Sequence, residues 1–544
     1  MSTVFVQESP RLTNTYASDD LLRTYLEWKL GADLLASIER ELFDLGELAA
    51  GRLFELQRAD RRNEPTLTQW DPWGNRIDRI EVTPLWREAE RLAARLGLVA
   101  IPYERKEGSW SRTRQFALVY LFHPVTDVYS CPLAMTDGAA RTLLECHNAR
   151  LIERAVPHLT SRDPAEFWTS GQWMTESTGG SDVGLSQTTA HRDASGAWHL
   201  HGKKWFTSAA TSQMALTLAR PEGNGPGGSG LALFYLETRR PDHSLNGIRI
   251  ERLKDKLGTR KVPTAELSLE GATAELVAGT RDGTRAIEPM LKITRTWNSV
   301  CAIASMRHAL ALAQDYAARR RAFGVTLAEQ PLHRETLAEL EAITAGAFLL
   351  TFFVIELLGR EEAGLLDDDE KALLRFLTPI VKLATGKQAV QVVSEAIEAF
   401  GGAGYIEDTG IPTLLRDTQV LPIWEGTTNV LSLDALLRAD PGRALSSLRA
   451  WMRRATSGAG GGVCKSFAET ASTAIDHAIR WLSSTRDRMA LQAGARRFAM
   501  TIARAVELGL LVEYGNAMRN DEAITAIQRW CQRLSRAGVD SIQD

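Results

Sequence analysis

The spacing of apolar residues changes twice along the chain, and each change predicts a different kind of structure. Helical spacing runs through most of the first part, and short alternating or wholly apolar runs replace it from about Trp173. After Gly279 the helical spacing returns in three long segments, at 296–321, 332–358 and 371–400. Long helices with sustained apolar faces suit an antiparallel bundle. We therefore expect a mainly α protein with a central β domain.

The N-terminal part carries two helix signals and one loop signal. The pair Asp19-Asp20 can cap a helix over Leu21–Leu26, and 86–98 has apolar residues at i, i+3 and i+4 before it ends at Gly97. Between them, 64–76 is rich in Pro, Gly, Asn and Trp. This composition predicts an irregular loop packed by its own aromatic residues.

The middle region predicts a compact β domain of short strands separated by turn residues. The expected strands are 197–201, 214–219, 231–236, 248–251 and 265–270. The glycine-rich run 223–228 matches the dinucleotide pattern G-x-G-x-x-G. A strand rather than a helix follows it, and Pro226 lies among the glycines, so we interpret it as a hairpin loop.

The C-terminal part predicts an added helical domain. Asp440-Pro-Gly interrupts the bundle pattern, and the glycine-rich 457–463 predicts a flexible connection before helices at 466–490 and 493–516. We expect the last bundle helix to stop at Gly401-Gly402, in a left-handed cap. The expected domains are an N-terminal α domain with an extension (1–172), a middle β domain (173–280), a helix bundle (281–440) and an additional basic helical domain (441–544).

The charge of the chain is unevenly distributed. The 544 residues are 44% hydrophobic and 24% charged, which is typical of a protein with several globular domains. The net charge is −3, but 441–544 contains 15 Lys and Arg against 9 Asp and Glu, a net charge of +6. A basic domain on an acidic body indicates a polyanion partner such as DNA. Arginine-rich surface helices are the favoured alternative, because no run of five like charges occurs.

Cysteine and histidine usage indicates neither a disulfide framework nor a metal site. The five cysteines are odd in number, widely spread and never spaced as C-x-x-C, which fits a reducing cytoplasm. His199 and His201 share a strand face, but no third ligand lies at metal-site spacing, so we expect no metal. No secretory signal is visible, and the most apolar stretch, 347–358, is too short to span a bilayer and predicts a buried helix.

Two segments about twenty residues apart form a candidate cradle for a flat ring and its diphosphate. The first, Met174–Val183, is a run of hydroxyls and glycines whose backbone N–H groups can approach a diphosphate closely. The second, 202–208, places the Trp205 indole against the ring and the Thr207 hydroxyl at its edge, on one face of an extended stretch. In this order and at this distance they resemble the FAD-binding segments of the acyl-CoA dehydrogenase family.

A third segment, Val420–Val430, carries a lone carboxylate among apolar and aromatic neighbours. Glu425 is followed by a glycine and by hydroxyls that can cap a helix beginning near Thr428. Such a carboxylate is a candidate for taking a proton from carbon. The alternative, that Glu425 is only a first-turn helix residue favoured by the helix dipole, is equally well supported by spacing alone.

Further motifs strengthen the resemblance to the acyl-CoA dehydrogenases. Trp-Glu-Gly-Thr at 424–427 resembles the segment whose glutamate removes the α-proton of an acyl thioester. Arg-Arg-Arg-Ala-Phe-Gly at 319–324 resembles the turn whose arginine reaches the FAD pyrophosphate of a neighbouring subunit. The resemblance implies two catalytic residues, Glu425 as base and Arg295 in support. It implies a cofactor-binding set of Met174, Thr175, Gly180, Ser181, Trp205, Thr207, Arg320, Phe323, Gly401, Gly402, Thr427 and Asn429.

Within the family, the chain is most similar to the AidB type, the adaptive-response flavoproteins of bacterial alkylation damage. The likeness includes 251–258 and the extra C-terminal domain. We expect a homotetramer, with a dimer as the alternative, and one of two functions. One is dehydrogenation of a short or branched acyl-CoA, with electrons passed to an electron-transfer flavoprotein-type acceptor. The other is association with double-stranded DNA through 441–544, with little dehydrogenase activity. Trp424 stands where the family has Tyr, and the larger indole beside Glu425 narrows the expected acyl pocket.

Overall fold

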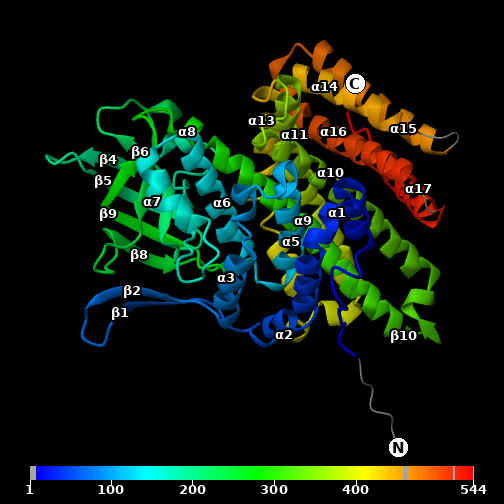
Figure 1. Ribbon diagram of the computed structural model, residues 1–544, viewed down its shortest axis with the longest axis horizontal. Helices are drawn as coiled ribbons and strands as arrows, with labels where there is room; N and C mark the ends of the chain where they lie inside the picture. Colours follow the sequence, from blue (N-terminus) through cyan, green and yellow to red (C-terminus); the bar gives the residue numbers. More distant parts are fainter. Residues whose placement is uncertain (1–7, 458–462, 519–520, 543–544) are drawn as a thin grey trace, which may run out of the picture. The chain divides into compact units, whose positions relative to one another are not determined.

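The computed structural model describes residues 8–457, 463–518 and 521–542 (Figure 1). The chain forms two compact units. The β-unit comprises residues 56–104 and 125–297, and the helical unit comprises the chain up to residue 55, residues 105–124 and the chain from 298 onward. Most of the expected flexible connection, 458–462, lies outside the described residues.

The β-unit is built on a seven-stranded sheet in which β6 pairs with both β4 and β7. Because β4, β5, β9 and β7 are also paired in that order, the strands form a closed ring. The strands of the sheet are β3 (Ser170–Trp173), β4 (Thr189–Arg192), β5 (Trp198–Thr207), β6 (Met214–Pro221), β7 (Ala232–Glu237), β8 (Ile248–Leu253) and β9 (Ala265–Leu276). Buried apolar side chains of the sheet, among them Trp173, Leu200 and Phe234, form the core of the β-unit.

The helices of the β-unit precede and follow this sheet in the chain. They are α3 (Pro84–Leu96), α4 (Ile101–Glu104), α6 (Ser130–Glu145), α7 (Ala149–Leu159) and α8 (Gly283–Ala286), and α2 (Arg52–Ala59) is divided equally between the two units. All five expected strands are confirmed, although β5 continues through 202–207. The strands β3 and β4 were not expected, because four residues are too few to show a clear alternation of apolar and polar side chains. The run 223–228 does join two antiparallel strands, β6 and β7, as expected.

The expectation of an irregular loop over 64–76 is wrong. The segment forms an antiparallel hairpin of β1 (Thr66–Trp70) and β2 (Arg76–Glu81). The Asp71 carboxylate organises its turn by accepting hydrogen bonds from the backbone N–H groups of Trp73 and Asn75, both at 2.8 Å. The Trp73 side chain is 89% exposed, so the aromatic residues do not pack the turn.

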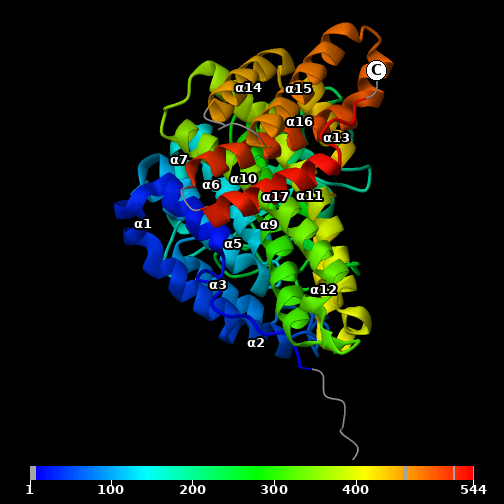
Figure 2. The same cartoon turned by 90° about the vertical axis from the view of Figure 1, so that its right-hand side faces the viewer.

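The helical unit contains the long bundle helices and the C-terminal helices (Figure 2). Its helices are α1 (Asp20–Ala50), α5 (Ser111–Phe122), α9 (Glu288–Arg319, which begins in the β-unit), α10 (Pro331–Glu362), α11 (Asp368–Glu398), α12 (Ile411–Thr418), α13 (Thr428–Leu437), α14 (Pro441–Thr456), α15 (Val463–Ser484), α16 (Arg488–Ala517) and α17 (Asp521–Arg536). A two-stranded turn of β10 (Arg321–Ala322) and β11 (Val325–Thr326) joins α9 to α10.

Local sequence signals account for several helix ends. The Asp19 side chain accepts a hydrogen bond from the backbone of Leu22 at the start of α1, and Gly97 takes the left-handed conformation after α3, both as expected. α11 ends earlier than expected, at Glu398, and its cap residue Ala399 is right-handed; Gly401 beyond it does take a left-handed conformation, with φ +58°. By length and composition α10 is apolar enough to cross a membrane, but 89% of its most apolar window is buried inside the protein. It is therefore a core helix.

The C-terminal helices pack directly on the bundle. α14 contacts α11, α16 contacts α10, α11 and α13, and α17 contacts α10. The rings of Phe353 and Trp451 lie 4.7 Å apart, and Phe498 packs edge-on against Phe376. One polar contact is buried in this interface, where the Gln388 amide donates to the Glu507 carboxylate at 2.8 Å. Burial raises the pKa of Glu507 to about 7, although the Gln388 hydrogen bond and the charge of Arg504 oppose it.

Glu507→Gln is expected to stabilise the protein in neutral solution but not in acid. The folded protein holds the Glu507 proton up to about pH 7, whereas the unfolded chain releases it near 4.5. The protonated Glu507 therefore adds to the free energy of unfolding, and this contribution is fully present below about pH 4.5. It is lost as pH rises through 7, and the total loss is roughly 3 kcal/mol. Urea unfolding at pH 5 and pH 8 measures the difference. Exposed Glu469→Gln is the control, and a gain that does not change with pH contradicts the assignment.

Candidate functional site

The first cradle segment is a loop of open backbone that leaves the end of β3. Residues 177–182 are exposed, and the loop folds back on itself through a bridge between Glu176 and Gly179. Gly179 has φ +126°, a conformation that side chains rarely adopt. At Gly180 a Cβ atom would lie 2.7 Å from the Thr175 hydroxyl oxygen. Both glycines are therefore required by the fold, and they leave backbone N–H groups accessible to a phosphate.

The second cradle segment is the last part of β5, and it is joined directly to the first. The backbone N–H of Trp205 donates to the carbonyl oxygen of Thr175 at 2.9 Å. A bulge lies between Lys204 and Thr207, and both side chains are fully buried. The Thr207 hydroxyl donates to the Ala265 carbonyl at 2.7 Å, so toward a ligand it can only accept. The structure thus brings together the two segments that the sequence singled out.

The Trp205 indole has a cation on one of its faces. The Lys254 ammonium lies 3.5 Å from the centroid of the Trp205 ring and 4.7 Å from that of Phe206. Cations are attracted to the faces of aromatic rings, so this contact fixes the orientation of the indole. Lys254 therefore occupies one of the two faces that the expected packing of Trp205 against a flat ring could use.

A buried ion pair joins the two cradle segments, and the sequence analysis missed it. The Lys204 ammonium is fully buried and lies 2.8 Å from both Glu176 Oε1 and the Leu218 carbonyl oxygen. Glu176 also accepts from the Thr188 hydroxyl at 2.6 Å and from the Gln187 N–H at 2.6 Å. The sequence contained a signal for this ion pair, because Glu176 lies in the first cradle segment and Lys204 in the second.

The pKa values of Glu176 and Lys204 are set by burial and by the attraction between the two charges. Burial opposes the charge on Glu176, but the Lys204 ammonium and the hydrogen bonds outweigh it and hold the pKa of Glu176 below its ordinary value. Burial lowers the pKa of Lys204, and the charge of Glu176 offsets this only in part. The pair is a charged tether in a dry interior, where losing either partner leaves an uncompensated charge.

The predicted base lies in the helical unit, on a strained backbone. Glu425 has φ +58°, in the left-handed region that costs a non-glycine residue roughly 1–2 kcal/mol. Gly426 follows with φ +104°, and a Cβ atom there would lie 2.8 Å from Leu431 Cδ2. α13 begins two residues later at Thr428, as expected, although the Thr427 side chain does not cap it. Such strain persists only where the surrounding structure holds it, and it is concentrated at functional sites.

Two buried polar side chains hold this strained segment in place. The Lys382 ammonium, on α11, is fully buried and donates to the carbonyl oxygen of Gly426 at 2.7 Å. The Asn298 amide, on α9, donates to the Leu421 carbonyl oxygen at 3.2 Å and accepts a hydrogen bond from the Trp424 indole. The indole beside Glu425 is therefore fixed. Neither Lys382 nor Asn298 belongs to a recognised motif; the signal for Lys382 was a charge within an apolar helix.

The turn between α9 and α10 presents an aromatic side chain to solvent. Phe323 is 99% exposed and has φ +52°. The Arg320 backbone N–H bonds to Tyr316, whose ring lies 4.8 Å from that of Phe400, so the turn is tied to the segment that contains exposed Gly401. An exposed aromatic on a defined turn is typical of a surface that another molecule covers.

The residues of the expected site divide between the two units. The β-unit holds Met174, Thr175, Gly180, Ser181, Trp205, Thr207 and Arg295, and the helical unit holds Arg320, Phe323, Gly401, Gly402, Glu425, Thr427 and Asn429. Within the β-unit the cradle residues adjoin one another. Within the helical unit, Thr427 and Asn429 lie exposed at the first turn of α13, next to Glu425. Their roles toward a cofactor stay predictions.

Three family models match almost the whole chain up to the C-terminal helices. They describe the adaptive response protein AidB N-terminal domain (residues 8–164), the acyl-CoA dehydrogenase middle domain (171–272) and the acyl-CoA dehydrogenase C-terminal domain (281–438).

Two named relatives and one solved structure are similar over most of their length. Acyl-CoA dehydrogenase family member 11 of Caenorhabditis elegans is 41% identical over 97% of this chain and 88% of its own. Putative acyl-CoA dehydrogenase AidB of Escherichia coli (strain K12) is 33% identical over 80% of each. The crystal structure of the C. elegans protein in complex with C11-CoA, 39% identical, covers 100% of this chain and 94% of that chain with a TM-score of 0.96.

Glu176→Ala is expected to destabilise the β-unit and to weaken flavin retention. It leaves the Lys204 ammonium buried without its counter-charge, which costs about 3–5 kcal/mol. Glu176→Ala combined with Lys204→Met removes both charges and is expected to recover most of the loss. Urea unfolding and flavin absorbance after gel filtration measure the two effects. Equal instability of the single and double variants contradicts the role of the pair as a tether.

Proposed function

Because this chain belongs to the acyl-CoA dehydrogenase family, we propose that it removes hydrogen from Cα and Cβ of an acyl-CoA thioester, with Glu425 as the base. The observation that carries the proposal is the strained conformation of Glu425, which Lys382 and Asn298 hold through its neighbours. A carboxylate fixed in this way meets the α-proton without first losing conformational freedom, which is an advantage in proton transfer from carbon.

FAD is the cofactor of the acyl-CoA dehydrogenases, and the cradle suits it. Open backbone at 177–182 fits a diphosphate. When bound, FAD supplies the hydride acceptor. The chain's own residues have the remaining tasks: Glu425 takes the α-proton, and backbone N–H groups stabilise the charge that develops on the thioester oxygen. Arg295 supports this arrangement from α9.

The substrate class within the acyl-CoAs is a finer part of the proposal. The Trp424 indole, held by Asn298, favours the short or branched acyl group that the family resemblance implied. The C. elegans relative was crystallised with C11-CoA, which favours a longer group. We propose an acyl-CoA substrate, and comparison of a panel of acyl-CoAs decides between the two chain lengths.

We propose the assembly from exposed apolar side chains and the cellular location from the free cysteines. The exposed side chains of Phe323, Leu332 and Tyr405 support a homotetramer in which a second copy of the chain covers this part of the helical unit. An electron-transfer flavoprotein-type acceptor then receives the electrons. All five cysteines lie in the described chain and are free thiols, which supports a cytoplasmic location.

Glu425→Gln is expected to abolish substrate-induced bleaching of the flavin. A glutamine cannot accept the α-proton, so the bleaching rate is expected to fall by about 10²-fold or more. The measurement is anaerobic stopped-flow absorbance with butyryl-, isovaleryl-, octanoyl- and undecanoyl-CoA. Exposed Glu398→Gln, near the end of α11, is the control. Bleaching of the glutamine variant at the unaltered rate would falsify Glu425 as the base.

A second function, association with double-stranded DNA, is favoured by the exposed arginines of the C-terminal helices. Removing 441–544 is a poor test of it, because α14 and α16 cover α10, α11 and α13 and their loss uncovers the bundle core. We therefore choose four exposed arginines: Arg486, Arg488, Arg529 and Arg536.

Replacing these four arginines with glutamine is expected to weaken DNA binding uniformly across sequences. It is also expected to reduce the slope of log K against log salt by about 0.9 for each DNA phosphate that the variant no longer neutralises. Fluorescence anisotropy with two unrelated duplexes across a salt series measures both. An unchanged slope, or no binding by the unaltered protein at low salt, counts against the DNA function.

A further inference from the structure

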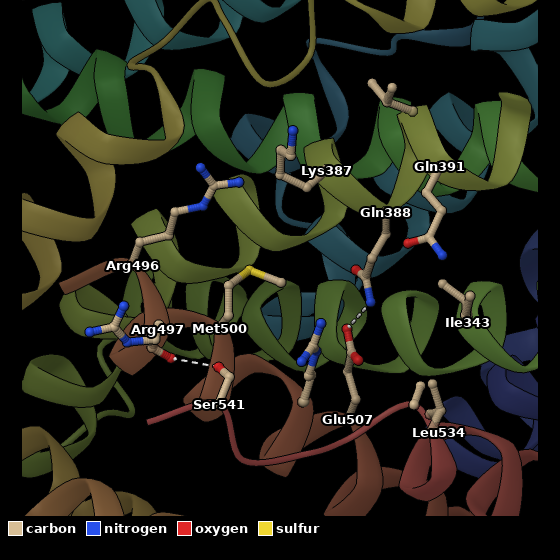
Figure 3. Close-up of a pocket in the computed structure, with 13 residues that line it drawn as sticks. Ile343, Lys387, Gln388, Gln391, Arg496, Arg497, Met500, Glu507, Leu534 and Ser541 are labelled. Atoms are coloured by element: carbon tan, nitrogen blue, oxygen red, sulfur yellow. Dashed lines mark hydrogen bonds between the residues drawn. The ribbon is translucent and has the colours of Figure 1, made fainter. Parts of the chain in front are cut away.

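A cavity of about 560 Å³ opens in the helical unit between the bundle and the C-terminal helices (Figure 3). Its walls are α10 and α11 on one side, and α16, α17 and the chain after α17 on the other. This volume lies in the usual range for small-molecule sites, roughly 300–1,000 Å³. None of its lining residues belongs to the flavin cradle or to the segment around Glu425.

One end of the cavity carries cations without partners. Arg496 and Arg497 on α16 and Lys387 on α11 face the cavity, and their charged groups make no hydrogen bond or ion pair with described residues. Arg504 adds a fourth cation, and its guanidinium donates to the Gly538 carbonyl oxygen at 2.9 Å. Arg496 and Arg497 are exposed to solvent, so an anion can approach these cations directly.

The deeper part of the cavity contains buried oxygen atoms that lack a hydrogen-bond partner. Gln388 and Glu507 are both buried and share the hydrogen bond drawn in Figure 3. Within the described chain, Gln388 Oε1 and Glu507 Oε2 have no hydrogen-bond partner although both atoms are inaccessible to solvent. Buried acceptors without a donor are rare because they lose their water without replacement. A ligand hydroxyl group supplies a partner for either oxygen, because it can both donate and accept.

We propose that this cavity binds a small phosphate monoester that bears hydroxyl groups. Its phosphate lies against Arg496, Arg497 and Lys387, and its hydroxyl groups, which both donate and accept, bind the unpaired oxygens of Gln388 and Glu507. Phosphate is favoured over carboxylate because its charge and three oxygens satisfy more than one guanidinium fork. The apolar side chains of the lining suit the carbon skeleton between the two polar ends; they are Ile343, Val390, Met500 and Leu534.

Isothermal titration of the full-length, FAD-loaded protein with ribose 5-phosphate tests the proposal, with ribose and inorganic phosphate as partial ligands. We expect one ribose 5-phosphate per chain, weaker binding of inorganic phosphate and no binding of ribose. Arg496→Gln with Arg497→Gln is expected to weaken ribose 5-phosphate at least about tenfold. Arg453→Gln with Arg454→Gln is the matched control. It removes an adjacent exposed arginine pair on α14, outside the cavity, and is expected to leave the affinity unchanged.

Three results would overturn the proposal. They are no binding of ribose 5-phosphate to the unaltered protein, an equal loss of affinity in the control pair, and equal affinity for ribose 5-phosphate and inorganic phosphate. If duplex DNA binds through Arg496 and Arg497 while ribose 5-phosphate does not, the arginines serve nucleic acid and the small-ligand site is rejected. Flavin bleaching by acyl-CoA in the arginine variants reports folding and activity separately, so failure here is distinguishable from failure of the dehydrogenase function.

Discussion

The buried contact between Lys204 and Glu176 is the constraint on which the cofactor cradle depends. A loop made of glycines and hydroxyls has no apolar side chains with which to anchor itself, and its exposed backbone must nevertheless keep one shape. The buried ammonium of Lys204 on β5 supplies the anchor, with the Leu218 carbonyl as its second acceptor. Charge inside a dry core is costly, and here it specifies which loop conformation meets which strand. The two motifs are therefore one structural unit.

In the helical unit, the segment around the predicted base is also held by contacts from outside it. Glu425 has an unfavourable left-handed backbone conformation, and side chains on neighbouring helices stabilise it. A buried lysine on α11 and an asparagine on α9 bind the backbone of its neighbours, and this fixes the backbone that carries the carboxylate. In both units a buried cation on regular structure holds an irregular, chemically useful segment.

Regular elements and motif segments were predictable from the sequence, because period and spacing are local properties. The strands from 214 to 270, the three bundle helices and the ends at Asp19 and Gly97 all follow from such patterns. The hairpin at 66–81 was missed because turn-forming residues hid its two short strands. The partners Lys382 and Asn298 were missed for another reason: only the fold brings residues so distant in sequence to the segment around Glu425.

The position of α10 has a consequence for how the protein is made. Its most apolar window is covered in the finished protein in part by α16 and α17, which the ribosome produces more than a hundred residues later. At ordinary rates of synthesis this interval lasts roughly ten seconds. During it the nascent chain displays a segment with the length and composition of a membrane anchor. Folding of α10 is therefore completed only when the last helices of the chain have been made.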